Sequence, residues 1–100
     1  MVEDASGQFV QGHPEWRVED GKLVAVYATG NFRAGAEFVS RMAQLADDLN
    51  HHPDVELTYP RVTVRTISHD VGHLTARDEE LAAGISQLAE AMGIPLQRAG

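Results

Sequence analysis

Cysteine is absent from this chain of 100 residues. The protein can therefore form no disulfide, no thiolate metal site and no cysteine nucleophile. Long apolar runs are also missing, since none approaches the roughly 20 residues that a membrane-spanning helix needs. The acidic start, Met1-Val2-Glu3-Asp4, lacks the positive charge that opens a signal peptide. Together these absences predict a cytoplasmic protein with no membrane association.

Basic residues are scarce as well. Eight Lys and Arg stand against 15 Asp and Glu, which gives a formal net charge of −7. A nucleic-acid-binding protein normally carries a basic patch or stripe, and anionic lipid attracts clusters of basic residues. The charge balance therefore argues against both nucleic acid and the membrane surface as partners.

The length and an apolar content of 43% predict one small domain with a modest core. The first dozen residues are mostly polar or small, so residues 1–12 are expected to form a flexible tail. We place the domain at residues 13–95 and a short C-terminal tail at residues 96–100.

The first half of the domain predicts a hairpin followed by a helix. Residues 16–19 and 22–28 are strand-like, and Asp20-Gly21 between them is typical of a tight turn. Asn31 is a candidate N-cap for a helix that must end by Pro53, because the residue before proline disfavours helical angles. Within that helix one apolar stripe has spacings of 4, 3 and 4 residues and consists of Phe38, Met42, Leu45 and Leu49.

The second half repeats this order. Residues 54–59 and 62–67 alternate in polarity around a break at Pro60-Arg61, which predicts a second, half-buried hairpin. Thr75 followed by Asp78 fits a capping box that opens a second amphipathic helix, which ends near Gly93. The order β-β-α-β-β-α predicts an α+β fold, a four-stranded antiparallel sheet with two helices on one face.

Four titratable residues lie at the ends of these predicted elements: His51, His52, His69 and Asp78. Their positions suggest one shared acid/base pocket. Each also has a structural explanation by itself. An imidazolium is favoured at a helix C-terminus by the helix dipole, and Asp78 can simply be the acid of the capping box. Three histidines also raise the possibility of zinc, but adjacent histidines at a helix end diverge, so we expect no metal site.

At this point the sequence resembles a known family, the pterin-4a-carbinolamine dehydratases. The resemblance covers residues 14–93 approximately and rests mainly on Asp47-x-x-x-His51-His52-Pro53, Tyr59, His69 and Asp78. It implies a four-stranded antiparallel sheet with helices on one face. It also implies dehydration of 4a-hydroxytetrahydropterin to quinonoid dihydropterin, without a metal or redox cofactor, by a homodimer or homotetramer.

The same resemblance implies roles for individual residues. His51 and His69 are the expected acid/base pair, with the division between them left open, and His52 is expected to bind or orient the pterin. Asp47 and Asp78 are expected to support the histidines, and Pro53 and Tyr59 to lie at the same site. Some relatives are interaction proteins instead, either a transcription-factor dimerization partner or assembly factors for carbon-fixing enzymes. Retention of all three histidines favours the enzyme.

The chain also departs from the family pattern. Val55 stands where an aromatic residue is frequent, and His73 stands where glycine is common. The leading helix of many relatives is expected to be missing or reduced to the N-terminal tail. These departures bear on pterin stacking, on access to the pocket and on tetramer formation, respectively.

Overall fold

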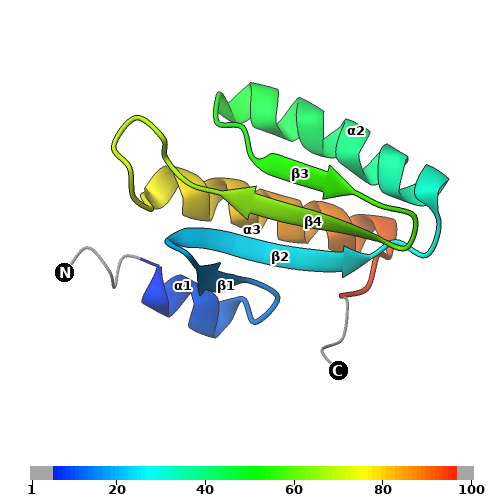
Figure 1. Ribbon diagram of the computed structural model, residues 1–100, viewed down its shortest axis with the longest axis horizontal. Coiled ribbons are helices and arrows are strands. Elements are labelled where there is room, and N and C mark those ends of the chain that lie inside the picture. Colours follow the sequence, from blue (N-terminus) through cyan, green and yellow to red (C-terminus); the bar gives the residue numbers. More distant parts are fainter. Residues whose placement is uncertain (1–5, 97–100) are drawn as a thin grey trace.

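The computed structural model describes residues 6–96 and shows an α+β fold (Figure 1). The elements are α1 (Gly7–Gly12), β1 (Arg17–Glu19), β2 (Lys22–Ala28), α2 (Phe32–Leu49), β3 (Asp54–Leu57), β4 (Arg61–Thr66) and α3 (Ala76–Met92). The strands form one antiparallel sheet in the order β1-β2-β4-β3. The long helix α3 runs behind β2 and β4, and α2 runs along β3. The predicted fold class is therefore confirmed.

The N-terminal segment is more ordered than the sequence predicted. Residues 7–12, expected to belong to a flexible tail, form the short helix α1. Phe9 and Val10 from this helix pack against the core. A six-residue helix has fewer than two turns, too few for an apolar period to be read. At the other end, Pro95 accepts a hydrogen bond from the Ala28 backbone and Leu96 pairs with β2, so the domain extends to residue 96. Of the two predicted tails, residues 1–5 and 97–100 lie outside the described residues.

The turns follow from local chemistry. Asp20 and Gly21 both have positive φ, at 53° and 76°, as a two-residue hairpin turn requires. Asn31 begins α2, and its side chain accepts a hydrogen bond of 2.8 Å from the Ala34 backbone. The first hairpin and the N-cap of α2 are both as predicted.

The core lies between the sheet and the two long helices. Leu23, Ala25 and Tyr27 on β2 face the same side and are buried, as their alternation predicted. They pair with Thr66, Val64 and Val62 on β4, which are buried too. Helices α2 and α3 complete the core with Phe38, Met42, Ala46, Leu81, Ala82, Ile85 and Ala89. Gly84 lets the two helices approach, since a Cβ there would meet Leu45 at 2.9 Å.

The edge strand β3 differs from its prediction. It ends at Leu57 rather than at residue 59, and Val55 and Tyr59 are 37% and 67% exposed. The expectation of a half-buried strand is therefore wrong for most of β3. The reason is that only one flank of an edge strand pairs with the sheet, so burial depends on neighbours that alternation cannot reveal.

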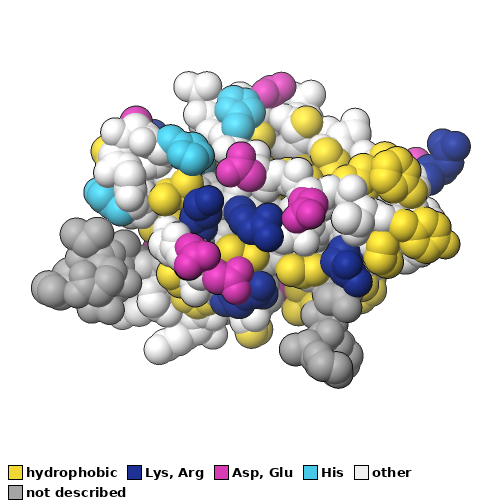
Figure 2. Space-filling view, viewed as in Figure 1, with side chains coloured by type: hydrophobic (Ala, Val, Ile, Leu, Met, Phe, Trp, Pro, Cys, Tyr) yellow, Lys and Arg dark blue, Asp and Glu magenta, His cyan; other side chains and the backbone are white. Residues whose placement is uncertain are grey.

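No helix within residues 6–96 covers the other face of the sheet, and this face carries both signs of charge. Figure 2 shows basic and acidic side chains mixed at the centre of this face. Arg65 on β4 forms an ion pair of 3.5 Å with Glu56 on β3. Such exposed pairs add little stability, but they keep this face polar.

Candidate active site

The C-terminal end of α2 sets the directions of the first two histidines. Asn50 has φ 53° and ψ 42°, a left-handed conformation that asparagine tolerates better than most residues. Its N–H bonds back to the carbonyl of Ala46, as does the N–H of His51 at 3.1 Å. This cap ends the helix and turns the chain. As a result His51 is buried, at 9% exposure, whereas His52 is exposed.

His51 forms a buried pair with Asp78. The distance between His51 Nε2 and Asp78 Oδ1 is 2.7 Å, and Asp78 is fully buried. Asp78 lies in the first turn of α3, where its Oδ2 accepts a hydrogen bond of 3.0 Å from the Thr75 N–H. The predicted capping box is therefore present. The capping function and the pairing with His51 use different carboxylate oxygens, so Asp78 performs both.

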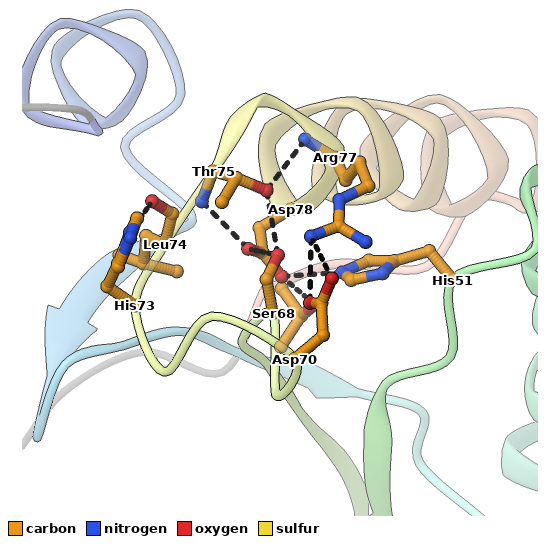
Figure 3. Close-up of polar contacts among 9 residues, drawn as sticks. His51, Ser68, Asp70, His73, Leu74, Thr75, Arg77 and Asp78 are labelled. Carbon is orange, nitrogen blue, oxygen red and sulfur yellow. Dashed lines mark hydrogen bonds and ion pairs between the residues drawn. The ribbon is translucent and has the colours of Figure 1, made fainter.

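Two hydroxyl groups complete the surroundings of Asp78 (Figure 3). Thr66 donates to Oδ1 at 2.6 Å, and Ser68 donates to Oδ2 at 2.7 Å. Burial by itself would raise the pKa of Asp78, but the hydrogen bonds from His51, Thr66, Ser68 and the Thr75 backbone hold it below its usual range. The carboxylate accepts four hydrogen bonds, which uses its full acceptor capacity.

The directions of these hydrogen bonds fix the proton positions. An ionised Asp78 can only accept, so His51 Nε2 must carry a proton. In a neutral His51 the lone pair is then on Nδ1, which is the nitrogen able to take a proton from a substrate. The Ser68 and Thr75 hydroxyls are 2.7 Å apart, and because Ser68 donates to Asp78, Thr75 must donate to Ser68. The orientation of His51 is thus determined by a chain of bonds that begins at the α3 cap.

His52 pairs with the other carboxylate that the sequence singled out. Its Nε2 is 2.9 Å from Asp47 Oδ1. Both side chains are largely exposed. A solvated pair of this kind contributes little to stability, but it limits the rotation of the His52 ring.

His69 reaches the same place from the loop after β4. His51, His52 and His69 together line a cavity of about 270 Å³, with Asn50, Ile67 and Asp70. His69 is exposed, whereas His51 is buried. The structure therefore brings the three histidines to one cavity, from the end of α2 and from the loop after β4.

An ion pair anchors the loop that carries His69. Arg77 Nη2 lies 2.8 Å and 3.1 Å from the two carboxylate oxygens of Asp70. The hydrogen bond from Arg77 is the main cause that lowers the pKa of Asp70. Because Asp70 follows His69 directly and Arg77 belongs to α3, this contact ties the histidine loop to the helix that carries Asp78.

Three residues named from the sequence lie elsewhere. Tyr59 is at the turn between β3 and β4, and the six residues of β4 place it about 20 Å from the His69 end of the strand. Within one chain it is therefore not part of this cavity. Pro53 lines a neighbouring apolar groove of about 160 Å³ beside Asp47 and His52. His73 is exposed, hydrogen-bonds to the Leu74 carbonyl, and does not line the cavity.

Sequence reasoning assigned no role to Thr66, to Ser68 or to the pair of Asp70 and Arg77. Thr66 could have been found, because it continues the inward alternation of Val62 and Val64 and a buried hydroxyl needs a partner. Nothing in the sequence pattern identified Ser68 as a hydrogen-bond donor to Asp78.

Among the described residues, no three His, Cys, Asp or Glu side chains lie close enough together to form a metal site. No helix in residues 6–96 is long and apolar enough to span a membrane.

A family model described as pterin 4 alpha carbinolamine dehydratase matches residues 2–88. The chain belongs to this family. A protein of Chloroflexus aurantiacus named "Putative pterin-4-alpha-carbinolamine dehydratase" is 39% identical over 75 residues, which is 75% of this chain and 81% of that protein. A Thermomicrobium roseum protein with the same name is 37% identical over 89 residues, 88% of this chain and 96% of its own length. The family resemblance read from the histidine motif is therefore confirmed.

Two solved structures share the fold of this family member. One is titled transcriptional coactivator/pterin dehydratase from Brucella melitensis, with a TM-score of 0.82 and 22% identity over 89% of this chain and 97% of that one. The other is titled a pterin dehydratase-like protein identified as a RuBisCO assembly factor in the alpha-carboxysome. Its TM-score is 0.63 and its identity 20%, over 75% of this chain and 89% of that one. At these identities the likeness concerns the fold alone.

Proposed function

We propose that this pterin-4a-carbinolamine dehydratase family member dehydrates 4a-hydroxytetrahydropterin to quinonoid dihydropterin. The C4a–O bond breaks, and the hydroxyl leaves as water after taking a proton from an acid. The ring N–H beside C4a gives its proton to a base, and its electron pair forms the new C=N bond. One proton is accepted and one is donated, so the reaction needs no external oxidant or reductant.

The buried pair of His51 and Asp78 is the observation that carries this proposal. An aspartate that only caps a helix needs no histidine beside it. A histidine that only lies at a helix C-terminus needs no buried carboxylate. Here Asp78 caps α3 and also pairs with His51. Its three other donors fix the carboxylate, which accepts the His51 Nε2–H bond at 2.7 Å. A neutral His51 fixed in this way presents Nδ1 as a general base. We assign proton removal to His51.

His69 then supplies the proton to the departing hydroxyl. It lines the same cavity as His51, and its exposure lets it recover a proton from water between turnovers. Histidine suits this exchange because its unperturbed pKa lies near neutral pH. His52, held by Asp47 at the cavity wall, orients the pterin ring.

The test is the decay of chemically generated 4a-hydroxytetrahydropterin. This compound dehydrates spontaneously, so the rate with protein must be compared with the rate in buffer alone. We expect an acceleration proportional to protein concentration. A decay rate equal to the spontaneous rate at micromolar protein would refute the proposed activity.

The alternative is an interaction protein on the same scaffold. Two structural neighbours have titles that name a coactivator and an assembly factor, respectively. A scaffold that only binds a partner needs Asp78 as the cap of α3 but does not need a histidine paired with that carboxylate. The pairing of His51 with Asp78 therefore favours the enzyme. Inactivity in the decay assay by a folded protein would favour the interaction protein instead.

A further inference from the structure

A second and larger cavity lies away from the three histidines. Its volume is about 460 Å³, compared with about 270 Å³ for the histidine cavity, and the two share no lining residue. Small-molecule sites in proteins usually measure roughly 300–1,000 Å³. The wall is formed by the loop before β1, by β2, by the second half of α3 and by the segment after it.

Two consecutive hydrogen bonds, each with a defined donor and acceptor, lie along one side of this cavity. The indole Nε1 of Trp16 can only donate, and it donates to Ser86 Oγ at 2.9 Å. Ser86 in turn donates its proton to Glu15 Oε2 in a short hydrogen bond. These residues lie 70 and 71 positions apart in the sequence, so the two bonds exist only in the folded protein. They hold the Glu15 carboxylate in place as an acceptor.

Tyr27 adds a buried hydroxyl to the cavity wall. The side chain is 2% exposed and lines the cavity, and its hydroxyl, which lies near Ser86, makes no hydrogen bond of acceptable geometry among residues 6–96. Buried hydroxyls are nearly always paired, so an unpaired one calls for an explanation. Burial raises the pKa of Tyr27 to about 12, which keeps the hydroxyl protonated at neutral pH. It can therefore both accept and donate a hydrogen bond to a ligand.

The remaining described residues of the lining are rich in hydrogen-bond acceptors. Glu90 adds a second carboxylate at the exposed rim. His13 bonds through Nδ1 to the Phe9 carbonyl at 3.0 Å, so Nδ1 carries the proton and a neutral ring offers Nε2 as an acceptor. Among residues 6–96, no Lys or Arg lines the cavity, and Ile94 and Pro95 contribute an apolar wall. Such a lining repels anions and suits a cation that has an apolar body.

We propose that this cavity is a second ligand site, which binds a small primary amine with an apolar body. The ammonium group bonds to the Glu15 carboxylate and to the Tyr27 hydroxyl oxygen, and the apolar body contacts the wall at Ile94 and Pro95. The site is separate from the histidine cavity and does not depend on the proposed dehydratase activity.

Benzylamine is the probe for the test, with benzyl alcohol and benzoate as neutral and anionic analogues. The chain contains one tryptophan, so its ¹H–¹⁵N spectrum holds a single indole signal, from Trp16 beside Ser86. We expect benzylamine to shift this signal and the amide signals of the cavity residues in a saturable way. Benzyl alcohol should bind about tenfold more weakly or worse, since a charge-assisted hydrogen bond is lost, and benzoate should not bind.

Two variants make the assignment specific. Glu15→Gln keeps the shape of the side chain but removes its charge, and should weaken benzylamine binding about tenfold. Tyr27→Phe removes only a hydroxyl that makes no hydrogen bond of acceptable geometry within residues 6–96, so the fold should persist while binding weakens. Benzylamine binding that is unchanged in Tyr27→Phe, equal binding of benzoate, or shifts confined to the histidine cavity would each overturn the proposal.

Discussion

Replacing Asp78 with asparagine separates the charge of this side chain from its shape. In the wild type, two oxygens accept four hydrogen bonds, from His51, Thr66, Ser68 and the Thr75 backbone. An amide offers only one oxygen, and its NH₂ group needs acceptors of its own. If the oxygen stays with Ser68 and Thr75, the NH₂ group faces His51 Nε2, which must then give up its proton and accept.

Both stability and activity should respond to this change. Leaving one buried polar group unsatisfied costs about 1–3 kcal/mol in the free energy of unfolding, which corresponds to about 4–8 °C in Tm for each kcal/mol in a domain of this size. His51 in the other tautomer carries its proton on Nδ1 and can no longer act there as the base. We therefore expect kcat to fall at least about tenfold.

The stability loss in Asp78→Asn should depend on pH, because the charge of Asp78 depends on pH. The pKa of Asp78 is lower in the folded protein than in the unfolded chain. The ionised carboxylate therefore stabilises the fold above the unfolded pKa of about 3.9, and this contribution is lost as the pH falls through the folded pKa. The difference in unfolding free energy between the wild type and Asp78→Asn should be largest at pH 7 and shrink below pH 4 approximately.

Denaturant unfolding at several pH values and the decay assay test this prediction together. Asn31→Ala is the control, because it removes the N-cap of α2 far from the histidines. It should cost about 0.5–2 kcal/mol and leave kcat unchanged. An Asp78→Asn variant with normal kcat, or with the same stability loss at pH 3 as at pH 7, would refute the reasoning.

Three further predictions concern metal, assembly and packing. Exhaustive chelation should leave the dehydration rate unchanged, because the proposed steps move only protons; a loss of activity that zinc restores would contradict them. Light scattering at micromolar concentration should give at least twice 10.9 kDa, since the edge strand β3 exposes Val55 and lies beside an apolar groove; a clean monomer would show that this edge stays unpaired. Gly35→Ala should lower the free energy of unfolding by about 1–3 kcal/mol, because the added Cβ would lie 2.5 Å from Leu57 Cδ1; unchanged Tm in thermal melts would show that Leu57 can move away.

Local sequence chemistry predicted most of the scaffold. The Asp20-Gly21 turn, the Asn31 cap and the Thr75–Asp78 capping box depend on a few neighbouring residues, and all three are present. The inward-facing residues of β2 could also be predicted from alternation, because β2 is a central strand with neighbours on both sides. Features of this kind are encoded within a few residues, and single-sequence reasoning can find them.

Features that depend on tertiary placement were harder to predict. The helix α1 is too short to show a period, and burial along the edge strand β3 depends on neighbours outside the sheet. The pairing of His51 with Asp78 joins residues 27 positions apart, and spacing alone could not show which carboxylate each histidine contacts. The same is true of the chain from Trp16 through Ser86 to Glu15, whose members carry no motif.

The central claim is that His51 and His69 transfer the protons of the dehydration. The most direct measurement is kcat for 4a-hydroxytetrahydropterin in His51→Ala and in His69→Ala, with circular dichroism to check the fold. His73→Ala is the matched control, because His73 is exposed and lies outside the cavity. We predict a loss of at least about tenfold in each of the two variants and none in the control. Unchanged turnover in both folded variants would contradict the mechanism.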